Sequence, residues 1–165
     1  YDKFLSTFKD TGEEWYVRYL KAELFQRLGK SNESIEQYFI SHTKRPDRGE
    51  PLVRLFWNYY YEENWSMAFE FAQKIKNLKC PIEYDCWQIE LNAYFENCWE
   101  LRDAIGVVHE RMGSKNKDLN YLKQAKEIFE ELQEKFNQGK LPQDDGGKRL
   151  QGNIEFINNI IKEIN

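Results

Sequence analysis

The chain has 165 residues, of which 32% are charged and 16% aromatic, and its formal net charge is −4. This length predicts one domain that can bury a core without disulfides or metal ions. The slight acidic balance excludes a general electrostatic attraction to nucleic acid, and the lack of an 18-residue apolar run excludes a membrane-spanning helix.

The cysteines indicate a reducing compartment. There are three, Cys80, Cys86 and Cys98. Their odd count and the lack of CxxC spacing favour buried or idle thiols over a disulfide framework or a zinc site. The start of the chain, YDKFLSTFKD, lacks both a signal-peptide pattern and an initial Met, so we expect a piece of a longer cytoplasmic protein. Any contact with the inner membrane surface would then be made through a partner.

Helical spacing of apolar residues dominates the N-terminal half, and strand signals are nearly absent. The first helix is expected to begin at Thr11, because TGEE has the pattern of a capping box, and to end at Gly29. A second helix should begin near Asn32 and stop at Pro46. The first helix has its apolar positions at Trp15, Val17, Leu20, Leu24, Phe25 and Leu28. Two more helices are expected at 50–62 and 64–78.

The C-terminal half continues the helical pattern. Helices are expected at about 85–97, 100–112, 119–136 and 148–164. Two polar segments, 113–118 and 138–147, predict connecting loops. In the last helix Leu150, Ile154, Ile157 and Ile161 follow heptad spacing, but the pattern is too short for a coiled coil and predicts a face that docks on the domain.

Small and aromatic residues recur with a period of 34. Ser34 and Ala68 are separated by this spacing, as are Phe25 and Tyr59. The pattern resembles the tetratricopeptide repeat (TPR), in which small residues let two antiparallel helices approach and aromatic residues fill the space beside them. The first copy carries Ala22, Phe25, Ser34, Tyr38, Ser41 and Pro46 in the positions of the repeat.

The resemblance implies an all-α, right-handed array of helical hairpins (an α-solenoid). The expected repeats are 13–46, 47–81 and 82–112, the third being degenerate, and residues 113–165 form a helical cap on the same domain. In TPR geometry the first helix of each pair lines a concave groove. Rings beside charged groups suit the binding of a peptide or a sugar there. The alternative is that these rings pack on a neighbouring helix or domain. The candidate groove residues are Tyr19, Arg27, Trp57, Tyr60, Tyr61 and Glu96.

A more particular resemblance begins at RPDRGEPL, residues 45–52. Together with the following FWNYYYEENWSMAFEFA, it is similar to the C-terminal TPR-like region of some bacterial and giant-virus glycosyltransferases. Arg45, Arg48 and Glu50 are the charged members of this box. The local alternative is a turn between repeats, in which Asp47 caps the next helix and Arg48 and Glu50 pair with each other or with a neighbouring helix.

Residue patterns for catalysis are missing. The chain has no Asp-x-Asp motif for a metal-bound nucleotide sugar, no glycine-rich phosphate loop and no spacing typical of a catalytic triad. His42 and His109 each stand alone on an expected helix, and Asp144 and Asp145 lie in an expected loop. We therefore expect no catalytic residue, cofactor or metal in these residues, so the chemistry of a parent enzyme would lie elsewhere.

Two functions follow from the patterns. The first is a non-catalytic TPR-like interaction module, the C-terminal part of a glycosyltransferase, which positions an acceptor, a partner or the catalytic domain. The second is a free-standing TPR adaptor that binds a peptide or protein in its concave groove. The expected partner is a protein or the parent catalytic domain, with a glycan acceptor as a further candidate.

Overall fold

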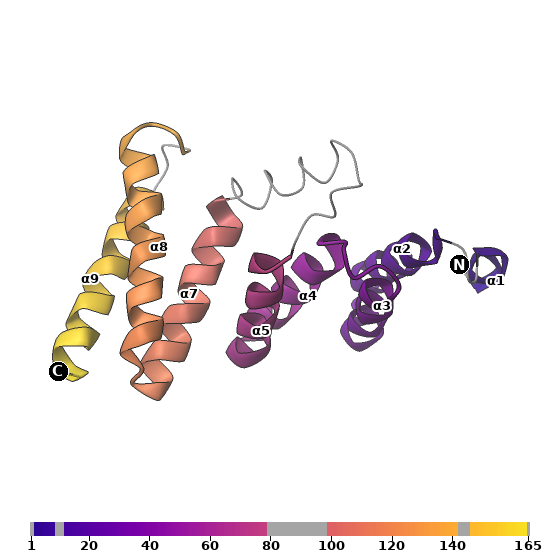
Figure 1. Ribbon diagram of the computed structural model, residues 1–165, viewed down its shortest axis with the longest axis horizontal. Coiled ribbons are helices and arrows are strands. Elements are labelled where there is room, and N and C mark those ends of the chain that lie inside the picture. The colour runs from indigo at the N-terminus through magenta and orange to yellow at the C-terminus, as the bar shows by residue number, and fades with distance from the viewer. Residues whose placement is uncertain (1, 9–11, 79–98, 142–145, 165) are drawn as a thin grey trace. The chain divides into compact units, whose positions relative to one another are not determined.

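The computed structural model describes residues 2–8, 12–78, 99–141 and 146–164 (Figure 1). These residues form α-helices and no strand, so the expected all-α class is confirmed for them. Glu96, the three cysteines and the helix expected at 85–97 lie outside the described residues. The helices are α1 (Asp2–Phe8), α2 (Glu14–Arg27), α3 (Ser31–Lys44), α4 (Glu50–Tyr61), α5 (Trp65–Lys76), α7 (Trp99–Asn116), α8 (Leu119–Asn137) and α9 (Gly146–Ile164).

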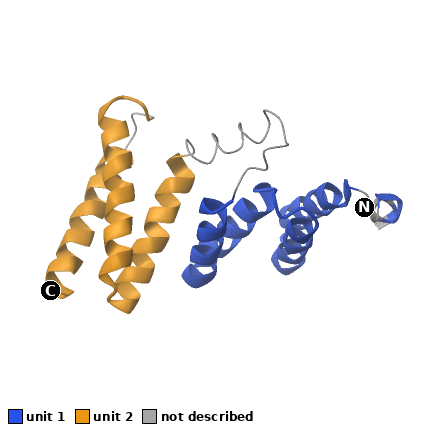
Figure 2. Ribbon diagram, viewed as in Figure 1, with its two compact units in different colours: residues 1–85 blue, residues 86–165 orange. Residues whose placement is uncertain are grey.

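The chain divides into two compact units, residues 1–85 and 86–165 (Figure 2). In the first unit, α2 packs on α3, α3 on α4 and α4 on α5, while α1 contacts α2. In the second unit, α8 packs on both α7 and α9. Each unit therefore buries its own apolar residues between neighbouring helices.

The hairpin of α2 and α3 is held by small residues at the helix contact. Ser34 and Ser41 are completely buried, and their hydroxyls donate to the carbonyls of Ala22 (3.0 Å) and Trp15 (2.7 Å). These bonds join the two backbones through the shortest polar side chain, which requires the helices to lie close together. Gly29 ends α2 as expected, because the chain turns there with a φ of 70°, a conformation that glycine adopts without strain.

The start of α2 differs from the expected capping box. The N-cap residue is Glu13, whose side chain makes no capping bond, and Glu14 is the first helical residue rather than the third. Thr11 lies outside the described residues. The Glu14 carboxylate is instead buried beside Lys44 of α3, 2.8 Å away. A contact between helices has therefore replaced the local cap.

The hairpin of α4 and α5 buries an apolar seam. Asn64 caps α5 by accepting a bond from the backbone N–H of Met67 (3.3 Å), and Ala68 is completely buried. Tyr59, which occupies the same position of the repeat as Phe25, is partly buried, and its ring stacks on Phe71 at 5.6 Å. The buried side chains of the seam are Leu52, Leu55, Phe56, Ala68, Phe71, Ala72 and Ile75.

In the second unit, α7 extends through most of the loop expected at 113–118 and ends at Asn116. Gly113 lies within this extension, and a Cβ there would lie 2.7 Å from Cγ of Leu122 and 2.9 Å from its backbone nitrogen. The close approach of α7 to α8 thus requires a helical glycine. Similarly, α9 begins at Gly146, inside the loop expected at 138–147, and Gly147 packs against Phe136.

The core of the second unit lies between α8 and α9. The expected docking face of α9 is confirmed for Leu150 and Ile157, which are fully buried, while Ile154 and Ile161 are partly buried against the same cluster. From α8 the cluster includes Leu122, Ala125, Phe129 and Leu132.

Candidate functional site

The most aromatic surface among the described residues is on α4, and we call it the aromatic cluster: Trp57, Tyr60, Tyr61 and Trp65. The Trp57 ring stacks on Tyr61 at 5.6 Å and meets Tyr60 edge to face at 5.4 Å. Tyr60 in turn meets Trp65, at the start of α5, at 5.6 Å. The four rings therefore support one another as a continuous layer.

The aromatic cluster rests on the core and opens to solvent at one end. Phe56, which is fully buried, contacts Trp57 at 5.3 Å and Tyr60 at 5.8 Å. Tyr61 is 75% exposed, whereas Trp57, Tyr60 and Trp65 are half-buried. Tyr61 is thus a large ring held in place by stacking, with most of its surface available to a partner.

A polar network joins α2, α3 and α4 beside this surface. The hydroxyl of the fully buried Tyr38 of α3 donates to Glu23 of α2 (2.6 Å) and also lies 3.0 Å from the side-chain oxygen of Gln26. Arg54 of α4 forms an ion pair with Glu23 (2.8 Å) and donates to the hydroxyl of Tyr19 (3.3 Å). The network thereby fixes the first helices of the two hairpins, α2 and α4, relative to each other.

The electrostatics of the network keep both tyrosines protonated. Burial raises the pKa of Tyr38 far above its ordinary value of 10.0, and the hydrogen bond to Glu23 raises it further. Burial also raises the pKa of Tyr19, although the bond from Arg54 opposes that effect. Both hydroxyls are therefore structural hydrogen-bond groups at neutral pH and not bases.

The expected groove residues are only partly brought together. Tyr19 belongs to the network just described and stacks on Tyr16 at 6.5 Å, whereas Trp57 and Tyr61 belong to the aromatic cluster. Arg27 is exposed at the end of α2 and takes no part in either group. Glu96 is outside the described residues.

Arg54 is the residue that links α2 to α4, and it is not among the expected groove residues. Its position three residues before Trp57, and therefore one helical turn away, is the sequence signal that could have identified it. Its role depends on Glu23 and Tyr38, which only the packing of three helices brings within reach.

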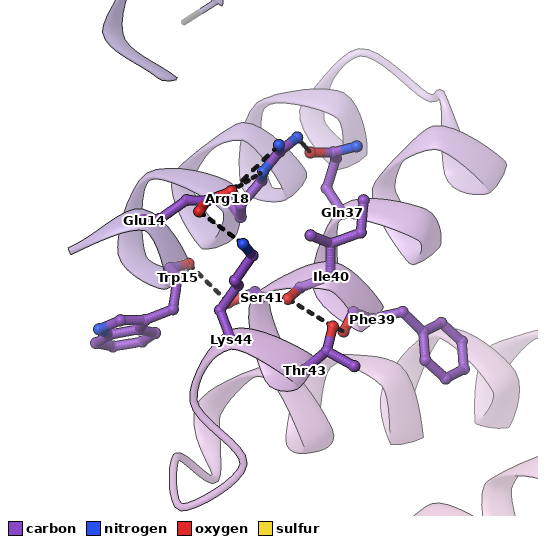
Figure 3. A network of polar contacts seen from close by, with 9 residues as sticks. All are labelled: Glu14, Trp15, Arg18, Gln37, Phe39, Ile40, Ser41, Thr43 and Lys44. Atoms are coloured by element: carbon purple, nitrogen blue, oxygen red, sulfur yellow. Dashed lines mark hydrogen bonds and ion pairs between the residues drawn. The ribbon is translucent and has the colours of Figure 1, made fainter. Parts of the chain in front are cut away.

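A second polar network closes the other end of the α2–α3 hairpin (Figure 3). Glu14 accepts from Lys44 at 2.8 Å and from Arg18 at 3.4 Å, and Arg18 also donates to Gln37 at 3.0 Å. Figure 3 shows these side chains reaching from α2 and α3 toward one another. Because Glu14 of α2 pairs with Lys44 of α3, and Arg18 of α2 donates to Gln37 of α3, the network holds the two helices together.

The charged residues of the box pair within the box. Arg45 makes two bonds to Asp47 (2.9 and 2.8 Å), and Arg48 pairs with Glu50 (2.7 Å). Of the two pairings expected for Arg48 and Glu50, the structure has the one with each other. The guanidinium of Arg48 also lies over the Trp15 ring at 4.5 Å, a cation–π contact with α2.

Asp47 does not cap α4 as expected. The N-cap of α4 is Gly49, and no side chain makes a capping bond there. The Asp47 carboxylate is occupied by Arg45, whose hydrogen bond lowers the pKa of Asp47 below its ordinary value of 3.8. Two internal ion pairs therefore take the place of a helix cap in this turn.

A cleft of about 620 Å³ lies between the end of α3, the turn after it and the end of α5. His42 lines it, and burial together with the nearby Lys74 lowers the pKa of that imidazole, so His42 is neutral at pH 7. Lys74 is paired with Glu70 at 2.7 Å. The cleft is lined by His42, Pro46, Asp47, Leu52, Glu70, Gln73, Lys74, Asn77 and Leu78.

Ionisable groups do not gather into a metal site in the part of the chain that the structure describes. In the same residues no helix has the length and apolar content needed to cross a bilayer. No protein-family model matches the chain, and a comparison with curated proteins found no significant match.

Proposed function

We propose that the chain is a non-catalytic, TPR-like interaction module that binds a partner through the aromatic cluster of α4. The observation that carries this proposal is Tyr61, which is 75% exposed while its ring is stacked on Trp57. A rigid, exposed tyrosine loses little conformational freedom on binding and offers both apolar area and a hydroxyl. Such residues are typical of interface hot spots.

The TPR-like assignment is supported by equivalent packing in the two hairpins. Ser34 of α3 and Ala68 of α5 are 34 residues apart, and both are completely buried. Small residues at these places fit close helix pairs, and the contact of α3 with α4 joins the pairs in series. We extend this arrangement to a right-handed array of about three pairs.

The parent protein is proposed to be a glycosyltransferase, on the basis of the box at residues 45–52. The ion pairs of Arg45 with Asp47 and of Arg48 with Glu50 support the turn between the two hairpins, and Arg48 also contacts the Trp15 ring of α2. The module would then position the catalytic domain or an acceptor without taking part in the reaction. In the alternative, a free-standing adaptor, the same aromatic cluster would bind a protein partner.

A pair of variants tests the binding surface. Tyr61→Ala and Phe156→Ala each remove one exposed ring, of which the first lies in the aromatic cluster and the second on α9. A protein captured by the unmodified chain should bind Tyr61→Ala at least tenfold more weakly, a typical loss for a hot-spot tyrosine. It should bind Phe156→Ala normally, as measured by titration calorimetry. Equal affinity for all three chains would contradict the proposal.

The nature of the partner is tested separately. A glycan acceptor should shift the indole N–H resonance of Trp57 at roughly millimolar concentration, the affinity expected for sugar stacking on one exposed ring. A protein partner should shift the same resonance at much lower concentration. The parent class is read from the complete gene, where a nucleotide-sugar domain next to this segment supports the glycosyltransferase and its absence supports the adaptor.

A further inference from the structure

The outer side of α2 carries a second apolar face, which we call the α2 stripe: Tyr16, Leu20, Leu24 and Leu28. Tyr16 is 46% exposed, Leu24 39% and Leu28 60%. Leu20, between them, is half-buried. Leu24 and Leu28 were expected to contribute to the core, so their exposure is a departure from the sequence pattern.

The α2 stripe is distinct from the face of α2 that packs on α3. Trp15 and Ala22 are buried on that inner face, where their carbonyls accept from the serines of α3. Residues four apart advance by about 40° around a helix, so the α2 stripe covers about 120° of the opposite side. Helix α1 contacts α2, but Tyr16, Leu24 and Leu28 remain exposed.

We propose that the α2 stripe binds the α2 stripe of a second copy of this chain, with the two helices antiparallel. A symmetric dimer needs a surface that complements itself after a two-fold rotation. The four residues of the α2 stripe are equally spaced, so the stripe complements itself when the two-fold axis passes at the level of Ala22. Tyr16 then faces Leu28 of the second copy, and Leu20 faces Leu24 of the second copy.

The charges at the two ends of α2 favour the antiparallel orientation. Glu13 is exposed at the start of the helix, and Arg27 is exposed at its end on the same side as the α2 stripe. In an antiparallel pair with this register, Glu13 of each copy lies about 6 Å along the helix axis from Arg27 of the other, within reach of the long arginine side chain. A parallel pair would instead place like charges together. Complementary charges of this kind select the orientation and register of an interface.

The area of the α2 stripe determines how tightly the two copies should associate. One helical stripe offers less area than the roughly 800 Å² per partner of a standard interface. Association should therefore be weak and depend on concentration, within about 1 μM to 1 mM. This surface is separate from the aromatic cluster, so the inference does not depend on the proposed function.

Sedimentation velocity over that concentration range tests the inference. The unmodified chain should change from monomer to dimer, and Leu28→Glu should raise the dissociation constant at least tenfold. Leu28 follows the last residue of α2 and is mostly exposed, so the fold should persist. Phe156→Glu, which changes an exposed ring in the other unit, is the matched control and should dimerise normally.

A charge swap tests the orientation. Glu13→Lys alone and Arg27→Glu alone should each weaken dimerisation, because each places like charges together in the antiparallel pair. The double variant with both changes should recover the affinity of the unmodified chain. Circular dichroism of each variant checks that α2 remains folded. A chain that stays monomeric up to about 1 mM, or a double variant that stays as weak as the single ones, overturns the proposal.

Discussion

Gly113 and Gly152 are both helical glycines of the second unit, but their surroundings are opposite. A Cβ at Gly113 would lie 2.9 Å from the backbone nitrogen of Leu122, which cannot move without shifting α8. A Cβ at Gly152 would meet nothing within 4 Å. The first position therefore needs glycine for close packing, whereas the second gains nothing from it.

Alanine at the two positions should change stability in opposite directions. We expect Gly113→Ala to lower the free energy of unfolding by roughly 1–3 kcal/mol, the typical cost of overpacking. Gly152→Ala should raise it by about 0.5–1 kcal/mol, because alanine restricts the unfolded chain and favours the helix. Urea denaturation followed by circular dichroism measures both, and destabilisation of equal size at both positions would contradict this account.

Asp103 and Asp47 form a similar contrast between two carboxylates. Asp103 on α7 is buried, with one oxygen paired with Arg149 of α9 (2.6 Å) and the other without a hydrogen-bond partner among the described residues. Burial raises the pKa of Asp103 above its ordinary value of 3.8, and Arg149 opposes this only in part. The pKa of Asp47 is lowered by its bond from Arg45.

These shifts predict opposite pH dependences. A carboxyl group whose pKa is raised on folding stabilises the fold below its unfolded pKa, and this contribution is lost as pH rises through the folded pKa. The stability of the unmodified chain relative to Asp103→Asn should therefore fall as pH rises from about 3 to 7. The stability of the unmodified chain relative to Asp47→Asn should instead increase as pH rises through the acidic part of this range. Urea unfolding at several pH values measures both slopes, and slopes of the same sign would refute the assignment.

The sequence predicts those features of the helices that depend on residues within one helix or turn. The glycine turn at Gly29, the buried small residues Ser34 and Ala68, and the apolar face of Leu150 and Ile157 all follow from spacing and residue type. In each case the sequence signal lies within one helix or turn. These features were read correctly because no distant residue is needed to produce them.

Other helices depend on distant residues. Helix α2 starts at Glu14, whose carboxylate pairs with Lys44, 30 positions later. Helix α7 continues past Met112, and Gly113 in this extension packs against Leu122 of α8. A local pattern contains neither partner, so the sequence indicated a capping box in one case and a loop in the other.

Helix α9 illustrates how one element supports a unit. Leu150 and Ile157 are fully buried against α8, and burying each such side chain contributes about 1.5–3 kcal/mol. A chain that ends at residue 145 would expose Phe129 and Leu132 of the same cluster. We expect this truncation to aggregate and to lower the melting temperature of the second unit.

Deletion of residues 1–8, which removes α1, is the control for shortening the chain. Among the described helices, α2 is the one with which α1 makes substantial contact. The deletion should therefore leave the second unit unchanged, as judged by light scattering and thermal melting. A truncated chain without α9 that remains monomeric and melts normally would show that α9 is not part of the core.

At the scale of the whole molecule, the candidate site draws on several elements of one unit. The TPR resemblance places Trp57, Tyr60 and Tyr61 on one helix of a groove, and in the structure Trp57 stacks on Tyr61 and meets Tyr60 edge to face. The connection from Arg54 to Glu23 and Tyr38 could not be predicted, because it joins three helices whose relative placement comes from packing. The division at residue 85 likewise depends on contacts over the entire chain.

Because the chain has two compact units, binding of a partner should slow amide hydrogen exchange in one unit and not in the other. A partner on the aromatic cluster should slow amide hydrogen exchange in α4, because binding stabilises the folded state that it contacts. The slowing should extend to α2 and α3, since Arg54 joins α4 to Glu23, and Glu23 accepts from Tyr38. Helices α8 and α9 have their own core and should exchange at the same rate with and without partner.

Hydrogen-exchange mass spectrometry of the full chain with its captured partner measures this difference for each helix. Arg54→Met is the informative variant, because it keeps a long side chain but removes the ion pair with Glu23. In this variant, the partner should still slow exchange in α4, but the effect on α2 and α3 should decrease. Equal slowing of α2 in both chains would show that the polar network does not couple the hairpins. Protection confined to α8 and α9 would place the binding surface in the second unit.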